Sequence, residues 1–272
     1  MPNFWLFQFA FILELMAVAL FVGYAARPVR NFSVAASLCL LMAAALQSLF
    51  TLCLAAQNER LPLGNAFEAL NFWSLTFALL ALRLEWRYQM GLLGAFLAPL
   101  AALLMLMGIR FSHVVPPAEL PVGSYFLFLH VALSMAGYAL FTATAAVAAA
   151  WFIEERQIRR LYLGQNYRLP ALEVLERLAK RLASWGLVGL SIGLLAGFFG
   201  DRAQFEVHLG SDPKVAMSFM TWLFYAVSLI LAKGGLRGRV LASLFSFGFL
   251  ALFFSYYLVN VFWGGHGFAG VH

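Results

Sequence analysis

This sequence contains few charged residues. Only 11% of its 272 residues are charged, whereas a soluble domain of this size carries about a quarter. The deficit excludes an ordinary soluble domain, because 63% of the residues are apolar and many fall in long uninterrupted runs. Such runs predict helices that cross a lipid bilayer.

Other absences narrow the possible chemistry. The two cysteines, Cys39 and Cys53, form no CxxC pair, so a redox role has no support. No serine–histidine–aspartate order, phosphate-binding loop or cysteine-rich metal motif is present. No small-residue cleavage site clearly ends the first apolar run, so we expect no cleavable signal peptide.

The apolar runs predict an all-α membrane protein with about eight transmembrane helices. We expect these helices to form a single transmembrane domain over residues 1–272. The expected spans cover about residues 4–26, 32–56, 66–84, 89–109, 124–153, 183–200, 215–232 and 239–263.

The basic residues predict the orientation of these spans. Of the 18 lysines and arginines, 14 fall in one set of connections and only Arg60, Arg110, Arg202 and Lys214 in the other. Positive residues favour the cytoplasmic side, so both termini are expected outside, at the periplasmic face. The net charge of +6 then reflects topology, and no nucleic-acid partner is expected.

The longest predicted cytoplasmic loop contains the segment "LPALEVLERLAKRLASW". Four leucines share one face of a helix there: Leu172, Leu175, Leu178 and Leu182. Two pairs have the i,i+4 spacing of helix ion pairs: Glu173 with Arg177, and Glu176 with Lys180. The segment predicts an amphipathic helix on the cytoplasmic membrane surface, or alternatively a docking surface for a partner.

Two connections end in helix-start signals. Asn65 stands three residues before Glu68 in "PLGNAFEALNFW", which is typical of an N-cap with a reciprocal partner. Asp212 precedes Pro213, an N-cap followed by proline in the first turn. Both signals have adequate structural explanations.

All five histidines are predicted to lie towards the outer face. His113 and His208 fall in outside loops, and His266 and His272 in the C-terminal tail. His130 lies about six residues into the fifth span, roughly 9 Å along the helix. A polar group at that depth needs a partner, so His130 either bonds to a neighbouring helix or ligates a metal or cofactor.

His266 is expected near the same membrane face, and two imidazoles can bracket a haem iron. The glycines beside His266 suit either a flat ligand or an ordinary helix end. Candidate wall residues are the aromatic side chains of Phe219, Trp222, Phe262, Trp263 and Phe268. Candidate partners for haem propionates are the four outside basic residues.

Several segments resemble the cytochrome c assembly family of haem-handling membrane proteins. They are "LPLGNAFEALNFWSLTFALLALRLEWR", "FLHVALSMAGYALF", "SDPKVAMSFMTWLFYA", "GLRGR" and "VNVFWGGHGFA", in the family's order from about residue 60 to 268. The resemblance implies a multi-pass protein of the bacterial inner membrane that binds haem at its outer face. It further implies that His130 and His266 are the axial ligands.

The chain departs from the family pattern in two places. Leu209 and Ser211 stand where two tryptophans of the haem platform are expected, although the Asp-Pro-Lys that follows is kept. Gln47 and Ile230 stand where haem-transporting members carry two further histidines inside the membrane. Neither residue is a useful iron ligand, so we expect the outer haem site and not the inner one.

The resemblance thus predicts a protein that holds haem b and handles or delivers it during cytochrome c maturation. The expected partners are membrane lipid, a second membrane protein of the maturation system and apocytochrome c. No stand-alone catalytic activity is expected, although a haem-lyase component acting with a partner stays open. The predicted cofactor-binding residues are His130, His266, Trp222, Trp263, Asp212, Lys214 and Arg202.

Three alternatives stay open. A divergent relative would regulate haem synthesis or act as a structural subunit of a membrane complex, without haem transfer. A transporter is suggested by Glu14 and Gln47 inside spans. A copper or zinc site would use His113, His208, His266 and Asp212.

Overall fold

The structure is a computed structural model that describes residues 3–58, 62–63, 65–88, 91–111, 125–159, 170–202 and 213–262. Its described residues form helices and contain no strand. The helices are α1 (Phe4–Ala26), α2 (Arg30–Asn58), α3 (Ala66–Tyr88), α4 (Gly91–Phe111), α5 (Tyr125–Arg159), α6 (Leu172–Arg202), α7 (Pro213–Lys233) and α8 (Gly238–Phe262). The predicted all-α class with eight helices is confirmed.

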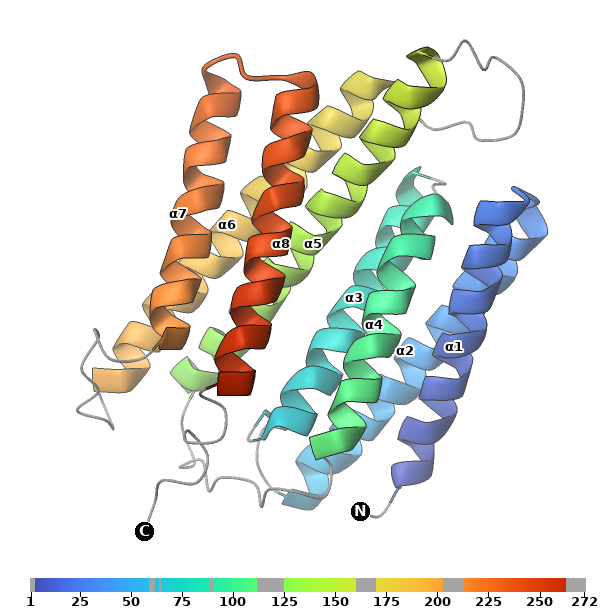
Figure 1. Ribbon diagram of the computed structural model, residues 1–272. Helices are drawn as coiled ribbons and strands as arrows, with labels where there is room; N and C mark the ends of the chain where they lie inside the picture. The colour runs from blue at the N-terminus through green and yellow to red at the C-terminus, as the bar shows by residue number, and fades with distance from the viewer. Residues whose placement is uncertain are drawn as a thin grey trace. The chain divides into compact units, whose positions relative to one another are not determined.

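The helices divide into two compact units. Unit 1 contains α1 to α4, and unit 2 contains α6 to α8 with nearly all of α5. Within each unit, consecutive helices run antiparallel, as Figure 1 shows. The single domain expected over residues 1–272 stays a prediction.

Among the residues that the structure describes, seven helices, α1 to α7, are long and apolar enough to cross a membrane. The part of α8 whose side chains are described, Gly238–Leu252, is a shorter apolar helix. The chain is therefore a multi-pass membrane protein. The predicted first span, residues 4–26, matches α1 at both ends. In contrast, α5 has 35 residues and extends past its predicted end at about residue 153, because polar residues continue the helix after the apolar run.

Aromatic rings form part of the core of unit 1. Phe7, Phe50 and Phe67, from three different helices, are each at most 1% exposed, and their ring centroids lie 5.2 to 6.0 Å apart. A glycine brings α4 close to α1, since a Cβ on Gly94 would lie 2.4 Å from the Phe21 ring. Small residues at helix contacts are typical of membrane bundles, where close packing drives association.

Close packing also joins α5 to α6 and α7 in unit 2. A Cβ on Gly137 of α5 would lie 3.0 Å from the carbonyl oxygen of Gly186 on α6, so the two backbones are in near contact. Phe141 of α5 stacks on the fully buried Tyr225 of α7, with centroids 3.7 Å apart and planes 10° from parallel. These contacts fix the lateral positions of the three helices.

The predicted amphipathic helix is not a separate element. Its residues form the first turns of α6, which continues unbroken for 31 residues. At 1.5 Å per residue such a helix is about 46 Å long, more than the roughly 30 Å hydrocarbon core. No proline or helix-ending signal interrupts it, so the amphipathic segment continues directly into the span.

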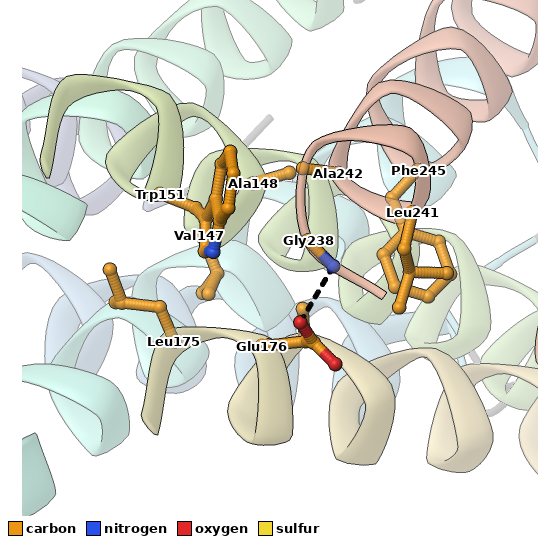
Figure 2. A pocket seen from close by; sticks show the side chains of 10 residues that line it. Val147, Ala148, Trp151, Leu175, Glu176, Gly238, Leu241, Ala242 and Phe245 are labelled. Atoms are coloured by element: carbon orange, nitrogen blue, oxygen red, sulfur yellow. Dashed lines mark hydrogen bonds between the residues drawn. The ribbon is translucent and has the colours of Figure 1, made fainter. Parts of the chain in front are cut away.

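The amphipathic segment of α6 makes a hydrogen bond to the beginning of α8. A carboxylate oxygen of Glu176 accepts a hydrogen bond from the backbone N–H of Gly238 at 2.8 Å (Figure 2). Its other oxygen contacts Lys180 Nζ at 2.6 Å, which confirms one of the two predicted ion pairs. A cavity of about 10 Å³ beside this contact is lined mainly by apolar side chains and is far too small for a cofactor.

Candidate functional site

His130 lies in the first two turns of α5, where its side chain reaches α6. Its Nδ1 atom lies 2.8 Å from the backbone carbonyl oxygen of Gly193. A carbonyl oxygen can only accept, so Nδ1 carries the hydrogen and donates it. The other ring nitrogen, Nε2, then bears the lone pair in a neutral imidazole, which is the form that ligates metals.

Two glycines of α6 make room for this contact. A Cβ on Gly197 would lie 2.6 Å from His130 Nδ1, and a Cβ on Gly193 would lie 2.5 Å from Ser134 Oγ, one turn along α5. Both distances are too short for any larger residue without a shift of the neighbouring group. The imidazole thus lies directly over the glycine face of α6, which fixes its position.

Aromatic side chains lie on the same helices. Phe126, one turn before His130 on α5, approaches Phe199 of α6 with ring centroids 6.5 Å apart. On α7, Trp222 donates its indole N–H to Ser191 Oγ on α6 at 2.7 Å and stacks with Phe219 at 5.7 Å. The predicted wall residue Trp222 is therefore anchored to α6 at Ser191, which lies on a different face of the helix from Gly193 because residues i and i+2 do not share a face.

Most other predicted site residues lie outside the described residues: His266, Trp263 and Asp212. Arg202 belongs to the last turn of α6 and Lys214 to the first turn of α7, but their side chains are likewise outside what the structure describes. The structure therefore describes His130 and Trp222 of the predicted set and leaves the other members as predictions.

The copper or zinc alternative also remains a prediction. Within the described residues, no group of three or more histidine, cysteine, aspartate or glutamate side chains is placed to hold a metal ion. The four residues named for that alternative, His113, His208, His266 and Asp212, all lie outside this part of the chain.

Gln47 and Ile230, the two intramembrane positions singled out from the sequence, differ in their surroundings. Gln47 is fully buried inside unit 1, whereas Ile230 on α7 is 67% exposed. Both are in helices that can cross the membrane. Gln47 lies in a buried polar cluster of unit 1 that also contains Glu14 and Ser74.

Sequence reasoning missed Gly193, Gly197 and Ser191 as supporting residues. A signal was available, because Gly189, Gly193 and Gly197 recur at every fourth position of α6. That spacing is typical of a helix face on which another helix packs closely. It could have predicted a close helix contact, but not that His130 makes it.

The fold and the site together define a multi-pass α-helical membrane protein that holds a histidine ring between two of its helices. Residues 63–266 match the family model described as cytochrome C assembly protein. This match covers more than half of the chain, and the chain belongs to the cytochrome c assembly protein family.

Relatives from plants and cyanobacteria agree with this assignment. The chain is 28% identical over 285 residues to the cytochrome c biogenesis protein CcsA of Prochlorococcus marinus strain MIT 9515, covering 94% of this chain and 88% of the relative. It is 29% identical over 230 residues to CcsA of strain MIT 9215, covering 73% and 72%. It is 26% identical over 234 residues to CcsA of Solanum bulbocastanum, covering 74% of each chain.

Proposed function

We propose that this protein acts in cytochrome c biogenesis by holding haem b and handling or delivering it for cytochrome c maturation. The observation that carries the proposal is the hydrogen bond from His130 Nδ1 to the Gly193 carbonyl. Histidines that ligate metals commonly donate their other ring N–H in this way, which fixes the tautomer and the ring orientation. Nε2 is then the free ligand atom.

The residues around His130 fit a haem group. Phe126 and Phe199 supply apolar area one turn from the imidazole along α5 and α6. Trp222 and Phe219 on α7 would contribute to the wall of the pocket. His266 would supply a second imidazole nitrogen to the haem iron, with Trp263 in the wall. Arg202, Lys214 and Asp212 would lie at the propionate edge, where the two basic residues balance negative charge.

Haem, when bound, supplies vinyl groups to which the cysteine thiols of apocytochrome c are joined. The task of this chain's own residues is to bind, orient and present the group. A second membrane protein of the maturation system would bring apocytochrome c to the site. The membrane would be the bacterial inner membrane, with both termini at the periplasmic face.

The proposal is tested by the absorption spectrum of protein extracted from membranes. We expect a Soret band in the wild type, and loss of most of it in His130→Ala and His266→Ala. His113→Ala is the matched control, since it removes a histidine predicted on the same side but outside the pair. Unchanged haem content in the double variant would rule out these two ligands.

A second candidate function is favoured by one sequence feature, the replacement of two platform tryptophans by Leu209 and Ser211. In that case the protein regulates haem synthesis or stabilises a complex and transfers no haem. Maturation of a reporter cytochrome c in a deletion strain separates the two functions. Restoration by the wild type and not by His130→Ala supports haem delivery, whereas normal maturation without the gene supports the second candidate.

A further inference from the structure

Glu14 is a carboxyl group inside the apolar interior of unit 1. It is the only charged residue of α1, and it is fully buried. Neither of its carboxyl oxygens receives a hydrogen bond from the described residues. An ionised carboxylate without donors or a counter-charge is very costly in such surroundings.

The helices packed on α1 offer no counter-charge. On α2, Arg30 is exposed and the titratable Cys39 and Cys53 are half-buried; on α4, Arg110 is exposed. Among the described residues, unit 1 buries no lysine, arginine or histidine. Its other buried titratable groups, Glu68 and Glu85, lie on α3 about 9 Å and 16 Å along the helix from Ser74. Both are acidic and therefore supply no positive charge.

The Ser74 side chain of α3 lies beside the Glu14 carboxyl. The Ser74 hydroxyl donates its one hydrogen to the Ala101 carbonyl at 2.9 Å, and its oxygen accepts from Gln47 Nε2 at 3.2 Å. A hydroxyl engaged in this way has no hydrogen left for a carboxylate, but it keeps a lone pair. The group that suits this position is therefore a protonated carboxyl, which donates.

Several buried oxygen acceptors gather around Glu14. Four of them have no hydrogen-bond partner among the described residues: both oxygens of Glu14, Gln47 Oε1 and Asn71 Oδ1. Unpaired acceptors in an apolar interior are costly, and a proton with the water that carries it would supply the missing hydrogens. Cation binding fits less well, because no group of acidic or imidazole ligands gathers here within the described residues.

A chain of polar groups leads from this cluster towards one end of unit 1. Thr51 Oγ1 donates to the backbone carbonyl oxygen of Gln47 at 2.8 Å and accepts from Asn71 Nδ2 at 3.0 Å. Asn65 and Glu68 follow at the start of α3. In the opposite direction the buried faces are apolar for about two turns, through Leu40, Ala43 and Ala44 on α2 and Ala78 and Ala81 on α3.

We propose that Glu14 is a proton-binding site within the membrane, reached from the end of unit 1 where α2 ends and α3 begins. The proton resides on the carboxyl beside Ser74 and exchanges through the polar groups of Gln47, Thr51 and Asn71. The site belongs to unit 1 alone and does not rest on haem binding by His130 in unit 2.

Infrared spectroscopy of the full chain in lipid tests the proposal directly. A protonated carboxyl gives a C=O stretch distinct from that of a carboxylate. We expect this band in the wild type at neutral pH and its loss in Glu14→Gln, which keeps the shape of the side chain. Absence of the band from the difference between the two spectra would show an ionised Glu14 and overturn the proposal.

The route is tested by transfer into heavy water, which shifts the band as deuterium replaces the proton. Thr51→Val removes the hydroxyl at nearly constant volume, and we expect it to slow the shift by roughly tenfold or more. Ser37→Ala is the matched control, because it removes a buried hydroxyl on the opposite side of the cluster and should leave the rate unchanged.

Other outcomes would count against the proposal. A band that never shifts in heavy water would mean a permanently protonated residue, so no exchangeable site exists. Equal slowing by Thr51→Val and Ser37→Ala would remove the assigned route. Loss of the band on addition of sodium at constant pH would show that a metal cation displaces the proton, and the site would then not be specific for protons.

Discussion

The imidazole of His130 and the backbone carbonyl of Gly193 are joined by a 2.8 Å hydrogen bond between residues 63 positions apart in the chain. The bond gives a fixed donor role to Nδ1 and leaves Nε2 as the acceptor or ligand atom. It also satisfies a polar group that would otherwise be costly inside the membrane. One contact therefore serves both the stability of unit 2 and the orientation of the predicted ligand.

Gly197→Ala should disturb this ligand without altering it chemically. The new Cβ would lie 2.6 Å from His130 Nδ1, so the imidazole or α6 must move. Loss of such support typically weakens metal binding by about ten- to a hundredfold, and we expect a comparable loss of haem affinity by titration.

The matched control for that change is Gly189→Ala on the same helix. Its Cβ would have its nearest neighbour, the Leu133 carbonyl oxygen, at 3.4 Å, which is ordinary contact. Haem affinity should stay close to the wild-type value. Equal affinities in Gly197→Ala and the wild type would mean that the glycine face does not orient His130.

Tyr225 should be among the most sensitive core positions of unit 2. Its ring is fully buried and stacks on Phe141 at 3.7 Å, so Tyr225→Ala removes a large packed side chain. We expect a loss of about 3–5 kcal/mol in the free energy of unfolding. Thermal unfolding in detergent, followed by circular dichroism, measures it.

Tyr225→Phe is the control, since it keeps the ring. The hydroxyl lies 3.5 Å from the Phe245 carbonyl, a weak hydrogen bond, so we expect a change of at most about 1 kcal/mol. A large loss in Tyr225→Phe would show that the hydroxyl, and not the stacked ring, carries the stability.

Glu176→Ala should loosen the beginning of α8. The carboxylate accepts the Gly238 N–H at 2.8 Å and places a negative charge at the positive end of the helix. Loss of an N-terminal capping acceptor costs about 1 kcal/mol. Denaturant unfolding of the variant should show this loss, whereas Glu173→Ala, an exposed position of the same helix, should not.

Asn65→Ala should weaken the beginning of α3. Asn65 Oδ1 accepts the backbone N–H of Glu68 at 2.8 Å, which confirms the N-cap predicted from the sequence. We expect a cost of about 1 kcal/mol in unfolding free energy, and little change in Asn65→Asp, which retains the acceptor. If both variants lost the same stability, the amide N–H₂ of Asn65 and not its oxygen would be the important group.

The cap at Asn65 and the Glu176–Lys180 pair could be predicted because each partner lies within four residues of the other. A helix brings such residues together through its own geometry, whatever the rest of the fold does. The end of α6 nearest Leu172 shows the limit of this reasoning. Its amphipathic pattern predicted a helix correctly, but could not tell whether that helix would be separate from the following span.

The sequence by itself determined the membrane class and the placement of the spans, because uninterrupted apolar runs can satisfy backbone polar groups inside lipid only as helices. It also supplied the family through segments that keep their order. Only the tertiary structure decided which atom of His130 is engaged, and which buried groups surround Glu14. Those facts depend on Gly193 and Ser74, which lie on other helices, and a contact between distant segments leaves no periodic pattern in the chain.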